Sequence, residues 1–191
     1  MMKMRFLLSQ LCALLFLSGC GEQGNTLREY VNFCQTRVSL PEQMIKIVNG
    51  RVDSINNYSP SLPVLVRYYG SKECTDCAFS HMRDNLKQLY LSKQEKTFDF
   101  IVIMAPPEDV REEVIARAVE MSLPLTIMVD DSYYLESQRG FPSSPSLHSF
   151  LLNLRGRPVF IGSPFRNSKT LTKFHRRLDA LHTNQVKLST N

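Results

Sequence analysis

The sequence contains no tryptophan, no internal repeat and no low-complexity tract among its 191 residues. It also lacks the aromatic motif of RNA-binding domains, and its formal net charge of +5 falls to about +3 when Lys3 and Arg5 leave with the N-terminal segment. The charge is weak, and the N-terminal segment described below has the layout of a secretory signal. We therefore exclude nucleic acid as a partner. We interpret the basic C-terminal residues as a solvated helix face with a basic end. These residues are Arg155, Arg157, Arg166, Lys169, Lys173, Arg176, Arg177 and Lys187.

The N-terminal apolar run is too short to span a bilayer as a mature helix. It covers residues 7–17, follows Lys3 and Arg5, and has the layout of a secretory signal. The run ends in Leu17-Ser18-Gly19-Cys20, which resembles the bacterial lipobox. That resemblance implies that the signal peptide, residues 1–19, is removed and that Cys20 is lipidated, carrying palmitate-type acyl chains.

The residues after Cys20 indicate which membrane would hold the lipid anchor. Gly21, with no aspartate there, favours the outer membrane by resemblance to the common sorting rule, and the inner membrane is the alternative. Residues 20–27 are polar and contain glycine, so we expect a flexible tether. The sequence therefore predicts a lipid-anchored domain that faces the periplasm.

Few cysteines remain for chemistry in the mature chain. Cys12 leaves with the signal and Cys20 carries lipid, which leaves Cys34, Cys74 and Cys77. In an oxidising compartment the close pair can form a disulfide with itself, so that Cys34 has no partner. We expect Cys34 to be buried and inert, and the alternative is that it exchanges with the pair.

Apolar periodicity and turn residues predict an α/β domain of about 165 residues. The two central crossovers predict parallel strands, and a late hairpin and helix complete a mixed central sheet flanked by helices. The predicted segments are a hairpin around Asn49-Gly50, strands at 64–69, 98–104 and 125–129, helices at 75–91, 108–121 and 171–181, an irregular stretch at 132–147, and a hairpin of 149–154 with 158–162.

The order strand, turn, Cys-x-x-Cys at a helix start, βαβ and terminal ββα resembles the thioredoxin fold. The chain resembles TlpA/redoxin-type thioredoxin-like proteins, and more closely thioredoxin-like lipoproteins of the Bacteroidetes. The matching stretches are the lipobox, LPEQMIKIVNG, VLVRYYGSKECTDC and LHSFLLNLRGRPVFIGSPF. The resemblance implies a tether and lead-in at 20–37, a thioredoxin-like domain at 38–185 and a tail at 186–191.

The position of the cysteine pair has its own chemistry. A thiolate at a helix N-terminus is stabilised by free backbone N–H groups and the helix dipole, so Cys74 is the expected nucleophile and Cys77 the resolving thiol. Glu73 and Asp76 place negative charge beside the sulfurs, which disfavours a thiolate. We therefore expect a modest lowering of the Cys74 pKa and a reducing pair.

Three positions depart from the thioredoxin pattern. Glu73 stands where thioredoxins commonly have tryptophan, and the preceding strand offers Arg67, Tyr68 and Tyr69 instead of a buried aspartate. His148 stands where the family has a cis-proline, and we expect a trans peptide there because non-proline cis bonds are costly. His148 either faces the sulfurs as a further catalytic residue, or is simply packed at a strand end.

These residues favour a thiol–disulfide oxidoreductase of the cell envelope that acts as a monomer on protein or small-molecule thiols and disulfides, with no cofactor and no metal. One alternative is a non-catalytic binding module with a structural Cys74–Cys77 disulfide. Another is a copper or zinc site formed by the pair with His81 or His148. The spacing differs from the Cys-x-x-x-Cys of copper chaperones, and no second Cys-x-x-Cys supports structural zinc. A peroxiredoxin is disfavoured because no Thr/Pro-flanked cysteine is found.

Overall fold

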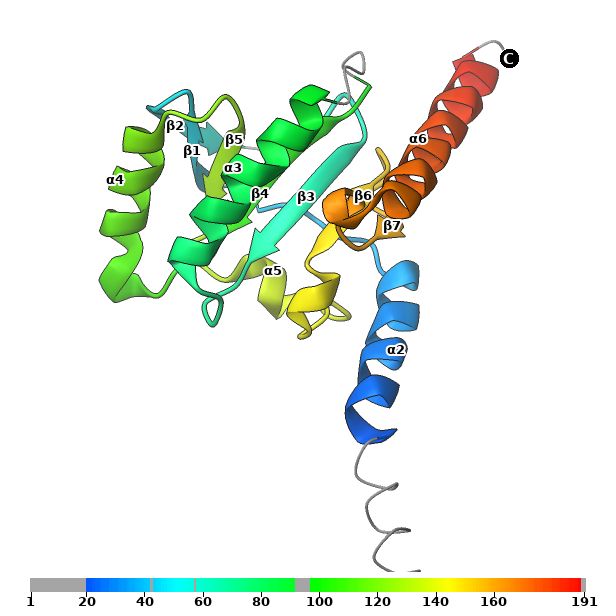
Figure 1. The fold of residues 1–191 in the computed structure, drawn as a ribbon, viewed down its shortest axis with the longest axis horizontal. Helices are drawn as coiled ribbons and strands as arrows, with labels where there is room; N and C mark the ends of the chain where they lie inside the picture. The colour runs from blue at the N-terminus through cyan, green and yellow to red at the C-terminus, as the bar shows by residue number, and fades with distance from the viewer. Residues whose placement is uncertain (1–19, 42, 57, 92–96, 190–191) are drawn as a thin grey trace, which may run out of the picture.

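The computed structural model describes residues 20–41, 43–56, 58–91 and 97–189, and these form one mixed seven-stranded sheet with helices packed on it (Figure 1). The strands are β1 (Gln43–Val48), β2 (Arg51–Asn56), β3 (Val64–Tyr69), β4 (Asp99–Met104), β5 (Thr126–Val129), β6 (Ser149–Leu152) and β7 (Pro158–Ile161). The helices are α2 (Cys20–Gln35), α3 (Thr75–Leu91), α4 (Arg111–Met121), α5 (Tyr134–Ser137) and α6 (Ser168–Ser189). Short 3-10 turns are η1 (Glu108–Val110), η2 (Pro145–Leu147) and η3 (Pro164–Arg166).

The sheet order is β2-β1-β5-β4-β3-β6-β7. Strands β3, β4 and β5 run parallel, as the two helical crossovers α3 and α4 require. The hairpins β1–β2 and β6–β7 add antiparallel strands at either side. The predicted α/β architecture with a mixed sheet flanked by helices is therefore confirmed.

Strand β3 shows why both faces of the sheet are covered. Its side chains alternate in direction, so Val66 and Tyr68 join the core under α2 and α5, whereas Leu65 and Tyr69 face α6 and α3. All four are buried. A central strand buried on both faces reads as an almost continuous apolar run, which explains the sequence Val64-Leu-Val-Arg-Tyr-Tyr69.

The Asn49-Gly50 hairpin is also confirmed. Both turn residues have positive φ angles, 49° and 71°, which is the backbone that a two-residue hairpin of primed type needs. Asparagine tolerates this region better than most residues and glycine adopts it freely. This short local signal was therefore sufficient to predict the pairing of β1 with β2.

The segment after Cys20 differs from the predicted flexible tether, because residues 20–35 form helix α2. Tertiary contacts hold the end of this helix: Phe33 is fully buried and its ring packs edge-to-face on Phe150 at 5.0 Å. The Glu29 carboxylate accepts hydrogen bonds from Ser143 Oγ at 2.6 Å and Ser144 N at 3.1 Å. Partners more than 100 residues away in sequence therefore hold the C-terminal half of α2, whose N-terminal half has the composition of a linker.

Cys34 is exposed, so the expectation of a buried cysteine is wrong. Cys34 follows the buried Phe33 directly, and successive helical residues point about 100° apart. The face of α2 that enters the core is therefore not the face that carries the thiol.

Helix α6 starts and ends beyond the predicted bounds, reaching Ser189. Phe174 and Leu178, one turn apart, anchor it against Leu65 and Leu151 of the sheet. Within the part of the chain that the structure describes, no helix combines the length and apolar character needed to cross a bilayer.

Candidate functional site

The cysteine pair lies at the junction between β3 and α3. Helix α3 begins at Thr75, and the Ala78 N–H donates to Cys74 O at 3.0 Å, which places Cys74 at the N-cap position. The Cys77 N–H donates to Cys74 Sγ at 3.3 Å, so the sulfur takes the place of a capping oxygen. Both thiols are exposed and carry no disulfide here. Cys74 is thus accessible, and one of the free N–H groups of the helix start is directed at its sulfur.

The two thiols have pKa values that move in opposite directions. The pKa of Cys74 is lowered, first by the hydrogen bond from the Cys77 thiol and then by the backbone N–H groups of Cys77 and Asp76. The pKa of Cys77 is raised, first because its thiol donates to Cys74. A thiolate is the nucleophile of disulfide exchange, so this asymmetry favours Cys74 as the attacking sulfur and keeps Cys77 protonated.

Asp76 opposes this activation, as the sequence suggested. Its carboxylate is exposed, and its charge raises the pKa of Cys74 against the hydrogen bonds. The Arg117 guanidinium of α4 forms an ion pair with Asp76 and also lies over the Phe79 ring, 4.9 Å from its centroid. Arg117 therefore partly neutralises the nearest negative charge to the sulfurs, at an exposed site where solvent screens the pair.

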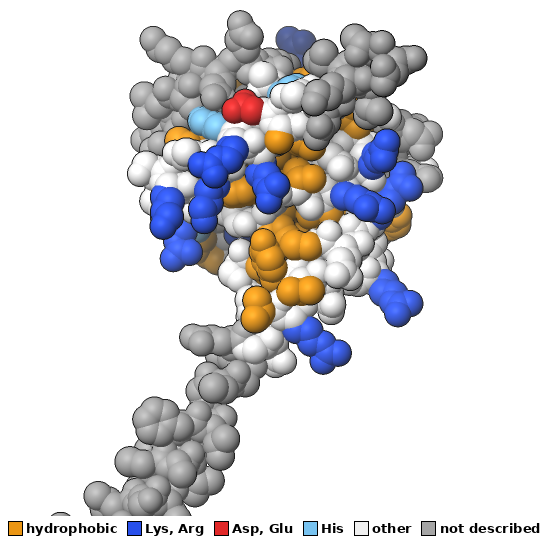
Figure 2. Space-filling view, turned by 90° about the vertical axis from the view of Figure 1, so that its right-hand side faces the viewer, with side chains coloured by type: hydrophobic (Ala, Val, Ile, Leu, Met, Phe, Trp, Pro, Cys, Tyr) orange, Lys and Arg blue, Asp and Glu red, His pale blue; other side chains and the backbone are white. Residues whose placement is uncertain are grey.

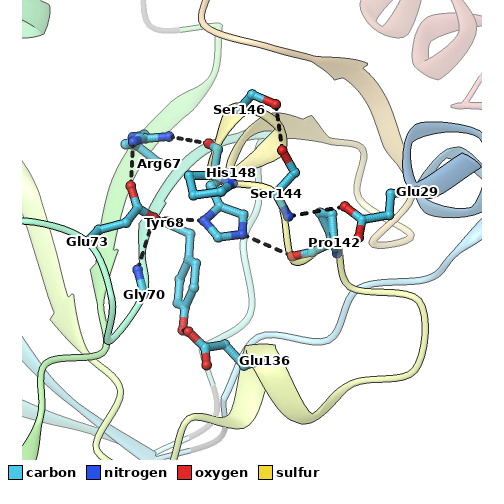
Figure 3. A network of polar contacts seen from close by, with 11 residues as sticks. Glu29, Arg67, Tyr68, Gly70, Glu73, Glu136, Pro142, Ser144, Ser146 and His148 are labelled. Atoms are coloured by element: carbon cyan, nitrogen blue, oxygen red, sulfur yellow. Dashed lines mark hydrogen bonds and ion pairs between the residues drawn. The ribbon is translucent and has the colours of Figure 1, made fainter. Parts of the chain in front are cut away.

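Glu73, in contrast, is not among the main contributors to the pKa shift of Cys74 and lies in a network of polar contacts (Figure 3). Its Oε1 lies 2.8 Å from His148 Nδ1 and accepts the Gly70 N–H at 3.1 Å. Its Oε2 accepts from Arg67 Nη2 at 3.0 Å. Burial pushes the pKa of Glu73 up, but the His148 and Gly70 hydrogen bonds and the Arg67 charge outweigh it and hold the pKa below its usual value. The carboxylate is thus a structural anion that pins the turn before Cys74.

His148 is the buried end of this network. Its Nε2 lies 3.0 Å from the Pro142 carbonyl oxygen, which only accepts, so Nε2 carries a hydrogen. The ring lies against Tyr68 and Phe141, with centroids at 5.2 Å and 5.5 Å. The described residues include no cis peptide, so the expectation of a trans peptide at His148 is confirmed.

The contacts of the His148 ring bear on whether it faces the sulfurs or is packed at a strand end. Both ring nitrogens are engaged, and no contact between His148 and Cys74 or Cys77 is recorded within the described ranges. His148 reaches the pair only through Glu73, the residue before Cys74. A catalytic role for His148 stays a prediction, and the contacts observed are those of a positioning residue.

The structure places His81 on the exposed side of α3, one helical turn after Cys77. Among the residues that the structure describes, no three His, Cys, Asp or Glu side chains gather in a way that could hold a metal ion.

Sequence reasoning missed the role of Arg67. Its Nη1 donates to the Pro145 carbonyl at 3.3 Å, and its guanidinium lies over the Tyr69 ring at 4.4 Å from the centroid. It therefore ties the turn that precedes Cys74 to the turn η2 before His148. A charge inside an otherwise apolar strand was the signal that could have found it, because a charge in such a place needs a partner.

Comparisons with known proteins give a fold and no sequence family. No protein-family model matches the chain, and no curated protein matches it. Among solved structures, a candidate electron transfer protein from Aquifex aeolicus VF5 is similar with a TM-score of 0.50 and 14% identity, covering 74% of this chain and 94% of that one. At this identity the similarity shows a shared fold and nothing finer.

Two further solved structures are similar at lower scores. An uncharacterized thioredoxin-like protein from Porphyromonas gingivalis has a TM-score of 0.46 and 14% identity, over 76% of this chain and 93% of its own. The thioredoxin domain of a thiol-disulfide oxidoreductase from Bacteroides vulgatus has a TM-score of 0.45 and 18% identity, over 75% of this chain and 98% of its own.

Proposed function

We propose that this chain, which has a thioredoxin-like fold, is a thiol–disulfide oxidoreductase in which Cys74 attacks and Cys77 resolves. The observation that carries the proposal is the placement of Cys74 Sγ at the N-cap of α3, where it accepts the Cys77 N–H at 3.3 Å. The opposite movement of the two thiol pKa values supports the assignment of roles. The substrates are proteins or small molecules that carry thiols or disulfides.

The proposed reaction uses only the two sulfurs and the substrate. The Cys74 thiolate attacks a substrate disulfide, which forms a mixed disulfide and releases one substrate sulfur as a thiolate that takes up a proton. Cys77 then loses its proton and attacks Cys74 Sγ, which forms the Cys74–Cys77 disulfide and releases the second substrate thiol. Two electrons pass to the substrate, and a dithiol reductant then reduces the Cys74–Cys77 disulfide with two electrons of its own, becoming a disulfide itself.

The reduction potential of the Cys74–Cys77 pair tests this proposal. We expect a reversible couple between about −120 and −280 mV when the protein is equilibrated with glutathione or dithiothreitol buffers. The Cys77→Ser variant, which cannot close the disulfide, is the control. A potential below about −300 mV would instead indicate a structural disulfide, and so a binding module.

We also propose that the chain is anchored by lipid at Cys20 and faces the periplasm from the outer membrane. The motif Leu17-Ser18-Gly19-Cys20 after an apolar segment supports this proposal. In cells fed a labelled palmitate analogue, the wild-type chain should take up label and fractionate with outer membranes. Cys20→Ser should do neither, and label retained on that variant would rule out Cys20 as the acylated residue.

A further inference from the structure

A large open cavity runs across the face formed by α6, α2 and the β6–β7 hairpin and reaches α3, the helix at whose start the cysteine pair lies. Its volume is about 1180 Å³, above the roughly 300–1,000 Å³ of sites that enclose small molecules. Helix α3 contributes His81 and Asp84 to the lining, at i+4 and i+7 from Cys77 and so on the same face of the helix. The cavity therefore reaches the face of α3 that carries Cys77, and its volume is that of a site for part of a larger ligand.

The lining is strongly basic. Four exposed cations, from η3 and α6, make no ion pair with any acid in the described part of the chain: Arg166, Lys173, Arg176 and Arg177. Thr170, Lys173 and Arg177 stand at i, i+3 and i+7, so α6 presents one side to the cavity. Of the described residues in the lining, Asp84 is the single acid. The sequence predicts a solvated helix face here and these side chains are exposed; the fold also arranges them around a hollow.

An apolar band runs between the cations. Figure 2 shows hydrophobic side chains that cross this face and continue onto the N-terminal helix, with Lys and Arg side chains on both sides. Phe160, Ile161 and Phe165 are partly exposed in the cavity. On α2, Leu27 and Val31 are 65% and 47% exposed, one turn apart. A continuous exposed apolar band flanked by one sign of charge is typical of a surface that binds a partner.

The end of the cavity nearest the cysteines is formed by β3. Arg67 and Tyr69 both line the cavity there, and the Arg67 guanidinium lies over the Tyr69 ring, 4.4 Å from its centroid. The pKa of Tyr69 is raised, first by burial, and the charge of Cys77 adds to that rise. This end of the cavity therefore lies near the second cysteine of the pair.

We propose that this basic groove, as we call the cavity with its apolar band, binds an acidic amphipathic polypeptide segment of the protein whose disulfide meets Cys74. The inference rests on the proposed function and names its substrate class. Acidic side chains would pair with the four free cations, and apolar ones would cover the band. A second copy of this chain would bring further positive charge to the groove. A membrane surface is flat and would not fill a hollow of this volume.

Binding is measured first, without thiol chemistry. The probe is a fluorescent amphipathic peptide that carries glutamates and leucines and no cysteine, and its anisotropy is followed with the full chain. The double variant Lys173→Glu/Arg177→Glu should bind at least about tenfold more weakly at physiological salt. Lys169→Glu/Arg155→Glu changes the net charge equally outside the groove and should bind like wild type. A peptide with lysine in place of each glutamate should bind no better than background.

Exchange is measured next, with the same peptide bearing one cysteine as a mixed disulfide with 2-thiopyridine. The neutral reagent 4,4′-dithiodipyridine reports the reactivity of Cys74 alone. The ratio of the peptide rate to the reagent rate should fall about tenfold in the groove variant and not in the matched control. Peptide binding without any thiol reaction would reject the proposed oxidoreductase and retain the groove.

Three results would contradict the proposal that the basic groove binds an acidic amphipathic segment. They are equal peptide binding by the two double variants, equal binding of the lysine peptide, and a preference confined to phosphatidylglycerol vesicles. In the last case the groove variant would bind such vesicles more weakly than the matched control but would bind the peptide equally, which would assign the cations to a membrane surface.

Discussion

Cys74→Ser is expected to abolish disulfide reduction by this protein, with a rate loss of roughly a thousandfold or more. The reason is that Cys74 is the exposed sulfur whose pKa is lowered, by the hydrogen bond from Cys77 first and by backbone N–H groups next. A serine hydroxyl at the same N-cap position would keep the helix start and would not attack a disulfide. The measurement is release of thiol from a peptide disulfide, followed under single-turnover conditions with the reduced protein.

The companion variant separates attack from resolution. Cys77→Ser should still attack, and a mixed disulfide between Cys74 and one half of the substrate should then accumulate and be visible by mass spectrometry. Cys34→Ser serves as the control for the third free thiol of the described residues and should react as wild type does. Retained turnover in Cys74→Ser, or an adduct found on Cys34, would show that the roles are assigned to the wrong sulfurs.

Glu73→Ala is expected to destabilise the fold by about 2–4 kcal/mol, the largest effect that we predict from one side chain on stability. The change removes an acceptor shared by Arg67, His148 and the Gly70 N–H. The His148 side chain, only 6% exposed, would keep a single partner, and Arg67 would lose its ion pair. Urea or thermal unfolding of both proteins measures the difference.

The pH dependence of this effect has a definite sign. The pKa of Glu73 in the fold lies below its ordinary value, because hydrogen bonds from His148 and Gly70 and the Arg67 charge outweigh the cost of burial. The ionised carboxylate therefore stabilises the fold above the unfolded pKa, about 4.3, and this stabilisation is lost as the pH falls through the folded pKa.

Glu73→Gln is the matched variant because it retains an oxygen for the Gly70 N–H and removes the charge, while its amide nitrogen replaces the oxygen that accepts from Arg67. The gap between wild type and Glu73→Gln should be widest near neutral pH and should close in acid. A gap that widens in acid, or an alanine variant within about 0.5 kcal/mol of wild type, would contradict the role given to the network.

Short-range sequence patterns predicted much of the fold. The Asn49-Gly50 turn predicted a hairpin because both residues tolerate the positive φ that it needs. The apolar run of β3, together with the amphipathic helix after it, predicted a buried parallel strand and a crossover. The same run placed the cysteines at a helix start, which is the feature of the candidate site that sequence reasoning found.

The site's electrostatics could not be reached in this way. From the sequence, Glu73 and Asp76 both place negative charge beside the sulfurs. In the fold each carboxylate forms an ion pair with a different cation, Glu73 with Arg67 and Asp76 with Arg117. Arg117 lies on another helix, and the second partner of Glu73, His148, lies 75 residues away along the chain. Contacts between residues so far apart in sequence produce no periodicity or spacing from which they could be predicted.

The α/β order, the hairpins and the Cys74–Cys77 pair at the start of a helix could be predicted from local patterns, because backbone propensity and apolar period act over a few residues. Three features needed the folded structure: residues 20–35 are helical, Cys34 is exposed, and basic residues of α6 line a cavity. Each of these depends on which surface of one element meets another. Long-range packing fixes that choice, and it is also what brings Arg67, Glu73 and His148 together at the turn before Cys74.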